Sequence, residues 1–121
     1  MSKEKAKKTT RLVLIIEDEP DAAHTIKGTF EDNGIAAVVV SSFDEFKAAI
    51  EKGLDPSEIV TDGLEGDWEK VVRNAKTVPV RLHSSDLDYQ KKARGMGIDV
   101  VAKTPDSPQI LLKELSKAGI K

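Results

Sequence analysis

Short apolar runs alternate with longer amphipathic segments along the chain. The first run, residues 12–16, is continuously apolar and branched, whereas a strand with one face in water would alternate apolar and polar residues. We therefore predict a strand buried on both faces. Four further runs rich in β-branched residues predict strands at residues 35–40, 58–61, 78–83 and 98–102.

The segments between these runs carry apolar residues at helical spacing. The most clearly bounded helix follows Ser42, because Ser42 and Glu45 form a capping-box pattern and Gly53 ends the segment. Ser107 followed by Pro108 predicts an N-cap and a first helical residue. The remaining helices are predicted at residues 21–33, 68–75 and 87–96. Residues 63–67 contain two glycines and predict an irregular loop.

Five strands alternating with five helices predict an α/β fold in three layers. A parallel sheet is covered by helices on both faces, and its connections are right-handed crossovers. A chain of 121 residues has the size of one domain. We assign residues 11–121 to this domain and the lysine-rich residues 1–10 to a flexible basic N-terminal arm.

Composition narrows the possible functions. The net charge of −2 gives no general affinity for nucleic acid or membranes. The absence of cysteine excludes disulfides, thiol chemistry and thiolate metal sites. The sequence contains no long apolar run and no apolar segment of a signal peptide at its start. We therefore expect a soluble, cytoplasmic protein that contacts neither nucleic acid nor membrane.

Polar residues gather where the predicted strands end. In a parallel sheet these ends share one edge, so residues far apart in sequence converge there. The residues concerned are Glu17, Asp18, Asp62, Ser84 and Lys103. Three carboxylates suit Mg²⁺, which binds a few carboxylates together with waters and phosphate oxygens. A lysine and a hydroxyl add donors for a phosphoryl group. Asp62 is then the expected nucleophile, forming an acyl phosphate.

A simpler interpretation stays open at this point. The acids after the first strand are also suited to the positive end of the following helix, where they would face solvent. Asp62 would then cap the third helix, and Lys103 would form an ordinary salt bridge with it.

With these residues in chain order, residues 11 to 118 resemble the receiver domains of two-component response regulators, including the stand-alone chemotaxis type. The resemblance rests on residues 15–20, 59–62 and 78–80, followed by Ser84 with Ser85 and by Lys103. It implies a flavodoxin-like sheet in the order 2-1-3-4-5. It also implies that Asp62 accepts a phosphoryl group from a phosphohistidine on a sensor histidine kinase or a histidine phosphotransfer protein.

The resemblance also implies a role for each site residue. Mg²⁺ would be bound by Asp62, by Asp18 directly, by Glu17 largely through water, and by the backbone carbonyl of Leu64. Because the sequence ends shortly after the fifth helix, we expect a single-domain phosphoacceptor. It would catalyse only its own phosphorylation and dephosphorylation and would not be an enzyme in the usual sense.

Two further roles follow for the phosphoryl group itself. Ser84 would hydrogen-bond it, and Lys103 would form an ion pair with it. The protein that responds to the phosphorylated state is not indicated by the sequence.

The sequence departs from the family at several positions. Val100 stands where an aromatic switch residue is usual, and Thr104 separates Lys103 from Pro105 where a Lys-Pro pair is usual. A cis Lys103–Thr104 bond would cost about 3 kcal/mol, so we expect it to be trans. The third and fourth helices are expected to be shortened. These departures suggest an alternative, a degenerate receiver that binds proteins independently of phosphorylation.

Two other classes fit less well. Phosphohydrolases with an aspartyl nucleophile usually carry a second aspartate two residues later, where this chain has Leu64. A nucleotide-binding role is disfavoured because the first loop is acidic instead of glycine-rich. Of the remaining residues, we expect His83 to point to the opposite face from Ser84, and Trp68 to pack over the short third helix.

Overall fold

The computed structural model describes the backbone of residues 11–117 and the side chains of residues 11–115. The predicted arm at residues 1–10 lies outside this range. Five parallel strands form one sheet in the order β2-β1-β3-β4-β5, as predicted. The strands are β1 (Leu12–Ile16), β2 (Ala36–Val40), β3 (Glu58–Thr61), β4 (Val80–Ser84) and β5 (Asp99–Ala102).

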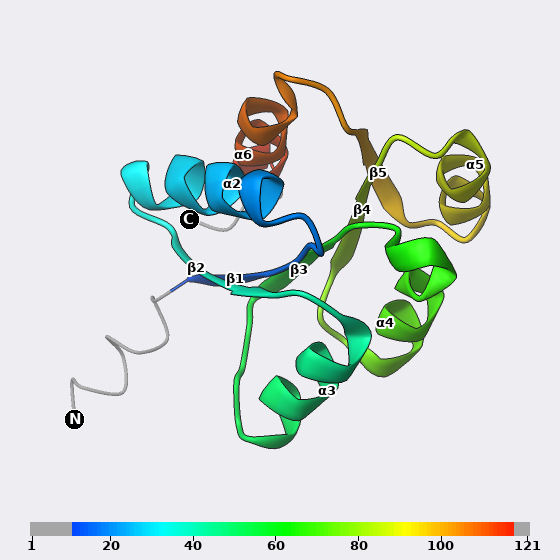
Figure 1. Ribbon diagram of the computed structural model, residues 1–121, viewed down its shortest axis with the longest axis horizontal. Coiled ribbons are helices and arrows are strands. Elements are labelled where there is room, and N and C mark those ends of the chain that lie inside the picture. The colour runs from blue at the N-terminus through cyan, green and yellow to red at the C-terminus, as the bar shows by residue number, and fades with distance from the viewer. Residues whose placement is uncertain (1–10, 118–121) are drawn as a thin grey trace.

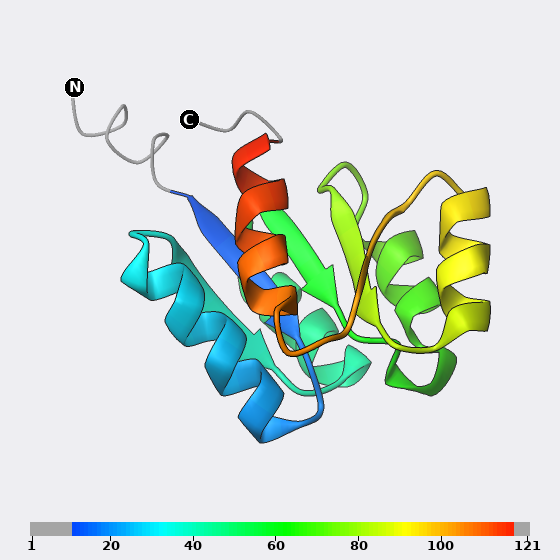
Figure 2. The ribbon, with the colours of Figure 1, turned by 90° about the horizontal axis from the view of Figure 1, so that it is seen from above.

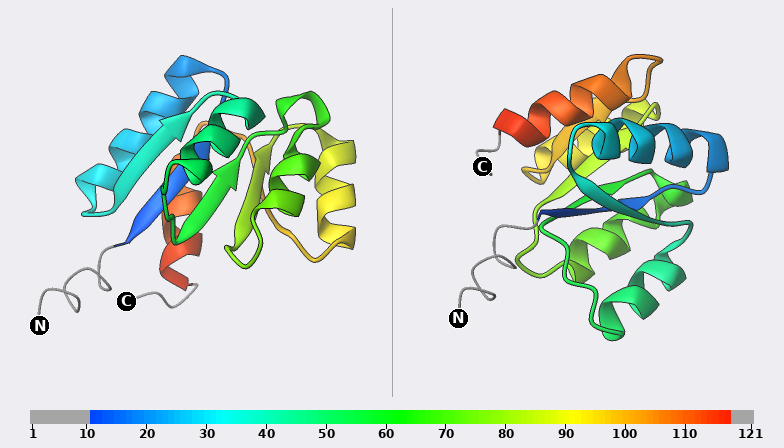
Figure 3. Two further views of the ribbon diagram at one scale, coloured as in Figure 1. Left: turned by 90° about the horizontal axis from the view of Figure 1, so that it is seen from below. Right: turned by 90° about the vertical axis from the view of Figure 1, so that its left-hand side faces the viewer.

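Helices cover both faces of the sheet (Figure 1). Helices α2 (Pro20–Asp32) and α6 (Ser107–Lys117) lie side by side on one face, as the view from above also shows (Figure 2). Helices α3 (Phe43–Glu51), α4 (Trp68–Asn74) and α5 (Leu87–Gly95) occupy the other face (Figure 3). The three predicted layers are confirmed.

Each face of the sheet has its own apolar core. On the α2/α6 face, Val13, Ile15 and Val60 pack against Phe30 of α2 and Leu111 of α6. The opposite face has two clusters of buried residues. One contains Leu14, Ile16, Phe46, Ile59 and Val71, and the other contains Trp68, Leu82 and Ala93. Strand β1 is buried on both faces from Val13 to Ile16, which explains why its sequence does not alternate.

The predicted strand and helix boundaries hold to within one or two residues, and two of the shifts have a local cause. Strand β4 begins at Val80 and not at residue 78, since Pro79 has no N–H to donate within a ladder. Ser107 is the first residue of α6 and not its N-cap. Its hydroxyl contacts Thr104 and His83 instead.

Local structure after β3 is tighter than predicted. Residues Leu64–Gly66 form a single 3-10 turn, η1, within the segment expected to be irregular. Leu64 and Glu65 have positive φ angles of 50° and 53°, a conformation that is unfavourable for residues with a Cβ atom. Helix α4 then has seven residues and α5 has nine, in keeping with the expected shortening.

No peptide bond in the described part of the chain is cis, so the Lys103–Thr104 bond is trans as expected. Among residues 11–117, no helix is both long enough and apolar enough to cross a bilayer.

Candidate functional site

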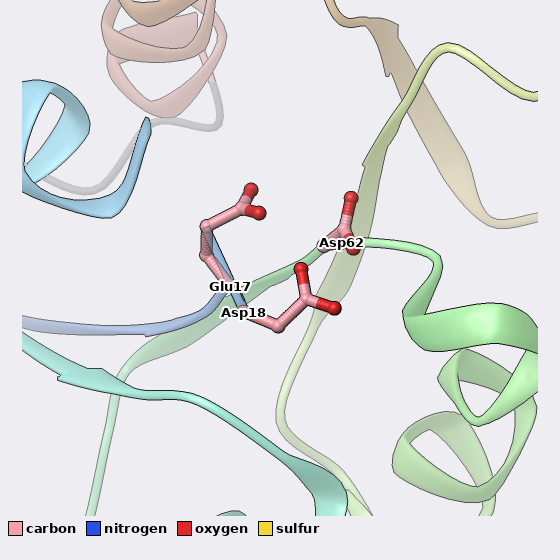
Figure 4. A group of neighbouring side chains, drawn as sticks. All are labelled: Glu17, Asp18 and Asp62. Carbon is pink, nitrogen blue, oxygen red and sulfur yellow. The ribbon is translucent and has the colours of Figure 1, made fainter. Parts of the chain in front are cut away.

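Three carboxylates converge at the carboxyl edge of the sheet (Figure 4). Glu17 and Asp18 follow β1, and Asp62 follows β3. The neighbouring strands pair Ile16 with Thr61, so the residues that follow lie side by side. One carboxylate oxygen from each of the three acids lies within 4.8 Å of the others. The predicted convergence of these acids is therefore present.

The burial of the three acids differs in a way that matters for a bound cation. Glu17 is buried, Asp62 is half-buried and Asp18 is exposed. Burial raises the pKa of Glu17, an effect that the Lys103 hydrogen bond opposes and the charge of Asp62 reinforces. A cation bound here would relieve that repulsion.

Lys103 reaches this group of acids from the loop after β5. Its Nζ lies 2.7 Å from Asp62 Oδ1 and 3.0 Å from Glu17 Oε1. Burial alone lowers the pKa of Lys103, but the hydrogen bonds to the two carboxylates more than offset this and raise it. The lysine is therefore charged at neutral pH. Three carboxylates and one ammonium leave a net charge of −2, which matches a divalent cation.

Ser84 flanks the loop that follows Asp62. The Ser84 Oγ atom would lie 3.4 Å from a Cβ atom placed on Gly63. The hydroxyl accepts the backbone N–H of Asp86 at 3.0 Å. The Ser84 carbonyl accepts from the Lys103 backbone N–H at 3.2 Å and from the buried Gln90 side chain at 2.7 Å. The structure thus brings all five predicted side chains to one end of the sheet.

The Leu64 backbone, predicted to supply a metal ligand, is engaged in the 3-10 turn. The Leu64 N–H donates to Asp62 Oδ2 at 3.2 Å. The Leu64 carbonyl accepts the Asp67 N–H at 3.0 Å. A carbonyl oxygen has a second lone pair, so this contact does not by itself prevent metal binding.

A polar hollow of about 190 Å³ lies beside the acids. It is lined in part by Asp18, Ser41, Ser42 and Glu65, which offer only oxygen ligands. Oxygen donors, a net negative charge and an open approach are the features that Mg²⁺ requires, since it keeps several of its waters. The residues present therefore fit a magnesium ion, to be held by Glu17, Asp18 and Asp62.

Two features of this region were missed by the sequence analysis. The ring of Tyr89, from α5, lies over Gly63 so closely that a Cβ atom there would be 2.7 Å from its Cδ2. Tyr89 also packs against Trp68, which is fully buried. The second feature is a hydrogen bond of 2.7 Å between His83 Nε2 and Ser107 Oγ. His83 points to the α2/α6 face, opposite to Ser84, as expected.

We compared the sequence and the structure with known proteins. No protein-family model matches the sequence, and neither does any curated protein. Solved structures do match. A response regulator receiver protein from Burkholderia phymatum has a TM-score of 0.76 and 20% identity, with 89% of this chain and 94% of that chain covered.

Two further receiver structures agree with this result. The receiver domain of Francisella response regulator 1452 has a TM-score of 0.74 and 22% identity, covering 89% of this chain and 95% of that one. A CheY-like receiver domain protein from Methanospirillum hungatei JF-1 has a TM-score of 0.74 and 19% identity, covering 90% and 93%. The chain has the receiver-domain fold.

Proposed function

We propose that the protein is a response regulator receiver that accepts a phosphoryl group on Asp62. The observation that carries this proposal is the position of Lys103. Its ammonium bridges Asp62 and Glu17 within a group of three carboxylates, at the sheet edge where this fold binds ligands. A lysine that only stabilised the fold would not require a third, exposed carboxylate beside two that already repel each other.

The chemistry proposed for Asp62 is an in-line displacement at phosphorus. A carboxylate oxygen of Asp62 forms a bond to the phosphorus of a phosphohistidine, and the P–N bond breaks. The electron pair of that bond stays on the imidazole, which takes up a proton. Bound Mg²⁺ would supply positive charge that offsets the repulsion between the attacking carboxylate and the phosphoryl oxygens.

The protein's own groups supply the remaining contacts. Glu17, Asp18 and Asp62 would hold the ion, and the Leu64 carbonyl would add its free lone pair. Lys103, already 2.7 Å from Asp62, would pair with an oxygen of the phosphoryl group once the acyl phosphate forms. The Ser84 hydroxyl would donate to another. Hydrolysis of the acyl phosphate by water would return Asp62 to its starting state.

The phosphodonor is proposed to be a sensor histidine kinase or a histidine phosphotransfer protein. Both present the phosphoryl group on an imidazole nitrogen, a good leaving group once protonated. The Asp62 side chain is 16% exposed at the carboxyl edge of the sheet, and we expect a protein-bound phosphohistidine to approach it from there.

The test is phosphorylation by acetyl phosphate in the presence of Mg²⁺, followed by intact mass spectrometry. We expect one added phosphoryl group on the wild type and none on Asp62→Asn. Removal of Mg²⁺ with EDTA should prevent the reaction. A wild type that gains no mass, beside a known receiver that does, would show the proposal to be wrong.

A second candidate is a receiver that binds partners independently of phosphorylation. It is favoured by Val100, which packs in the Trp68 and Leu82 cluster and leaves no aromatic residue at the usual switch position. It is also favoured by the engagement of the Leu64 carbonyl with Asp67. Under this alternative, Mg²⁺ titration leaves the fluorescence of Trp68, the single tryptophan, unchanged.

A further inference from the structure

The loop that carries Lys103 is held by one side-chain hydroxyl. Ser107 Oγ donates to the Thr104 carbonyl at 2.7 Å and accepts the Thr104 N–H at 3.2 Å. Both backbone groups of the residue next to Lys103 are therefore fixed by the same atom. Ser107 is 1% exposed, so water does not compete for these bonds.

The rest of this loop has little packing to hold it. Thr104, Pro105 and Asp106 are all exposed. The usual proline directly after the lysine is missing, and Thr104 has the freedom of an ordinary residue. The Ser107 Oγ bonds and the Ser107 N–H, which donates to the Thr104 carbonyl at 3.0 Å, are thus the main restraints on Thr104.

His83 anchors this hydroxyl to the sheet. Its Nε2 lies 2.7 Å from Ser107 Oγ, and the residue is 2% exposed. Burial, together with the nearby charge of Lys103, lowers the pKa of His83 to about 4. The ring is neutral at pH 7 and has one N–H. When the Ser107 hydroxyl proton goes to the Thr104 carbonyl, His83 carries its N–H on Nε2 and donates it to Ser107.

His83 also links, through chain neighbours, the two residues proposed to bind the phosphoryl group, Ser84 and Lys103. It directly precedes Ser84 at the end of β4, while Ser107 holds the residue directly after Lys103. A groove of about 340 Å³ between α2 and the loop borders this unit, lined by His83, Lys103, Thr104 and Ser107 among others. The loop therefore has room to shift if its hydrogen bonds are lost.

We propose that Ser107 and His83 are positioning residues for Lys103. They fix the backbone at Thr104, so that the ammonium is held between Asp62 and Glu17 and is ready to pair with a phosphoryl oxygen. This inference rests on the proposed function, since the role of Lys103 in binding the phosphoryl group is part of that proposal.

The test measures the rate of phosphorylation by acetyl phosphate with Mg²⁺, at a temperature where every variant is folded by circular dichroism. Ser107→Ala should react about tenfold more slowly than wild type, equal to about 1.4 kcal/mol in the barrier. His83→Leu should also slow the reaction. His83→Gln should stay within about twofold of wild type, because an amide N–H can still donate to Ser107.

Ser57→Ala is the matched control. Ser57 is half-buried at the opposite end of the sheet, where its hydroxyl accepts the Leu12 N–H at 3.4 Å. The same chemical change there should leave the rate unchanged. A Ser107→Ala rate equal to that of Ser57→Ala would overturn the inference.

A double-mutant cycle with Lys103→Met separates positioning from general structural damage. In the Lys103→Met background, Ser107→Ala should have no further effect, because the group it positions is gone. A tenfold loss that persists without the lysine would show that Ser107 acts in another way. If the wild type takes no phosphoryl group at all, the proposed function itself fails, and this inference with it.

Discussion

Position 63 requires glycine because of the Tyr89 side chain above it and not because of its backbone conformation. Its φ of −65° is open to any residue, but a Cβ atom would lie 2.7 and 2.8 Å from two ring carbons of Tyr89. We predict that Gly63→Ala lowers the free energy of unfolding by about 1–3 kcal/mol, since the half-buried Tyr89 ring must move. Urea denaturation followed by Trp68 fluorescence measures this.

Gly28→Ala is the control for that substitution. Gly28 lies within α2, and a Cβ atom there meets nothing within 4 Å. Alanine should raise the stability by about 0.5–1 kcal/mol through helix propensity. In a Tyr89→Ala background, the cost of Gly63→Ala should fall by at least about 1 kcal/mol. An unchanged cost would mean that the ring is not the obstacle.

The lowered pKa of His83 predicts how the free energy of unfolding depends on pH. Its folded pKa of about 4 lies below the ordinary value of 6.5, so the unfolded chain binds the proton more tightly. The contribution of His83 is complete above pH 6.5 and is lost as the pH falls toward 4. Between pH 7 and pH 5 the free energy of unfolding should drop by about 2 kcal/mol from this residue.

The difference between wild type and His83→Gln isolates this effect. Glu17, whose pKa burial raises, titrates with the opposite sign, because its contribution is lost as the pH rises above 4.5. That contribution is common to both proteins and cancels in the comparison. The glutamine variant should show a flatter profile between pH 7 and pH 5. Parallel profiles would mean that the buried ring is not the titrating group.

At the scale of the elements, a charged network joins strands at the edge opposite the candidate site. Glu58 of β3 pairs with Arg11 at 3.1 Å and lies 3.8 Å from Arg81 of β4. Arg81 also pairs with Asp99 of β5 at 3.2 Å, and Arg11 donates to the Leu115 carbonyl of α6 at 2.8 Å. Through these contacts the network connects strands β3, β4 and β5 with helix α6.

Loss of the central carboxylate should be costly. Glu58 is 3% exposed, and neutralising it removes the carboxylate charge that two largely buried guanidinium groups share. We predict that Glu58→Gln lowers the free energy of unfolding by about 2–3 kcal/mol, slightly less than for a fully buried pair because both arginines retain some contact with water. Chemical denaturation at neutral pH tests this.

Glu69→Gln provides the comparison. The Glu69 carboxylate pairs with Lys92 at 2.9 Å between α4 and α5, but the Lys92 side chain is exposed and that of Glu69 is 28% exposed. Its loss should cost less than about 1 kcal/mol. Equal losses for Glu58→Gln and Glu69→Gln would contradict a structural role for the buried network.

Most elements could be predicted from local pattern, and the exceptions have local causes. Strand β1 and the Ser42 cap follow from residues next to each other in sequence, and the cap is present, with the Glu45 N–H donating to Ser42 Oγ at 3.1 Å. Ser107 was misassigned because an N-cap pattern does not reveal a histidine brought beside it by the fold. The 3-10 turn was missed because it needs positive φ at Leu64 and Glu65, which propensity disfavours.

For the whole molecule, topology explains why the candidate site was predictable. Once the strands are parallel, Glu17, Asp62, Ser84 and Lys103 must share an edge, whatever the loops do. What topology does not give is the direction of side chains from the helices and loops. Tyr89 over Gly63 and the carbonyl of Leu64 bonded to Asp67 depend on the shortened segments around α4 and α5, for which no local pattern exists.

From the closeness of the three carboxylates we predict that Asp18→Asn changes thermal stability in opposite directions with and without Mg²⁺. Without the ion, Asp18→Asn removes one of three like charges within 4.8 Å and should raise the melting temperature. With Mg²⁺ at ten times its dissociation constant, the wild type should gain about 1.4 kcal/mol, because the ion binds the folded state alone. The variant should gain much less, so the order of stability reverses.

Thermal unfolding in EDTA and in a series of Mg²⁺ concentrations measures both effects on the same proteins. Asp88→Asn is a suitable control, since Asp88 is an exposed aspartate in the first turn of α5 and not part of the acidic group. Its response to Mg²⁺ should equal that of the wild type. If Asp18→Asn instead gains as much from Mg²⁺ as the wild type, the ion is not held between these acids. Their closeness would then reflect only the pairing of Glu17 and Asp62 with Lys103.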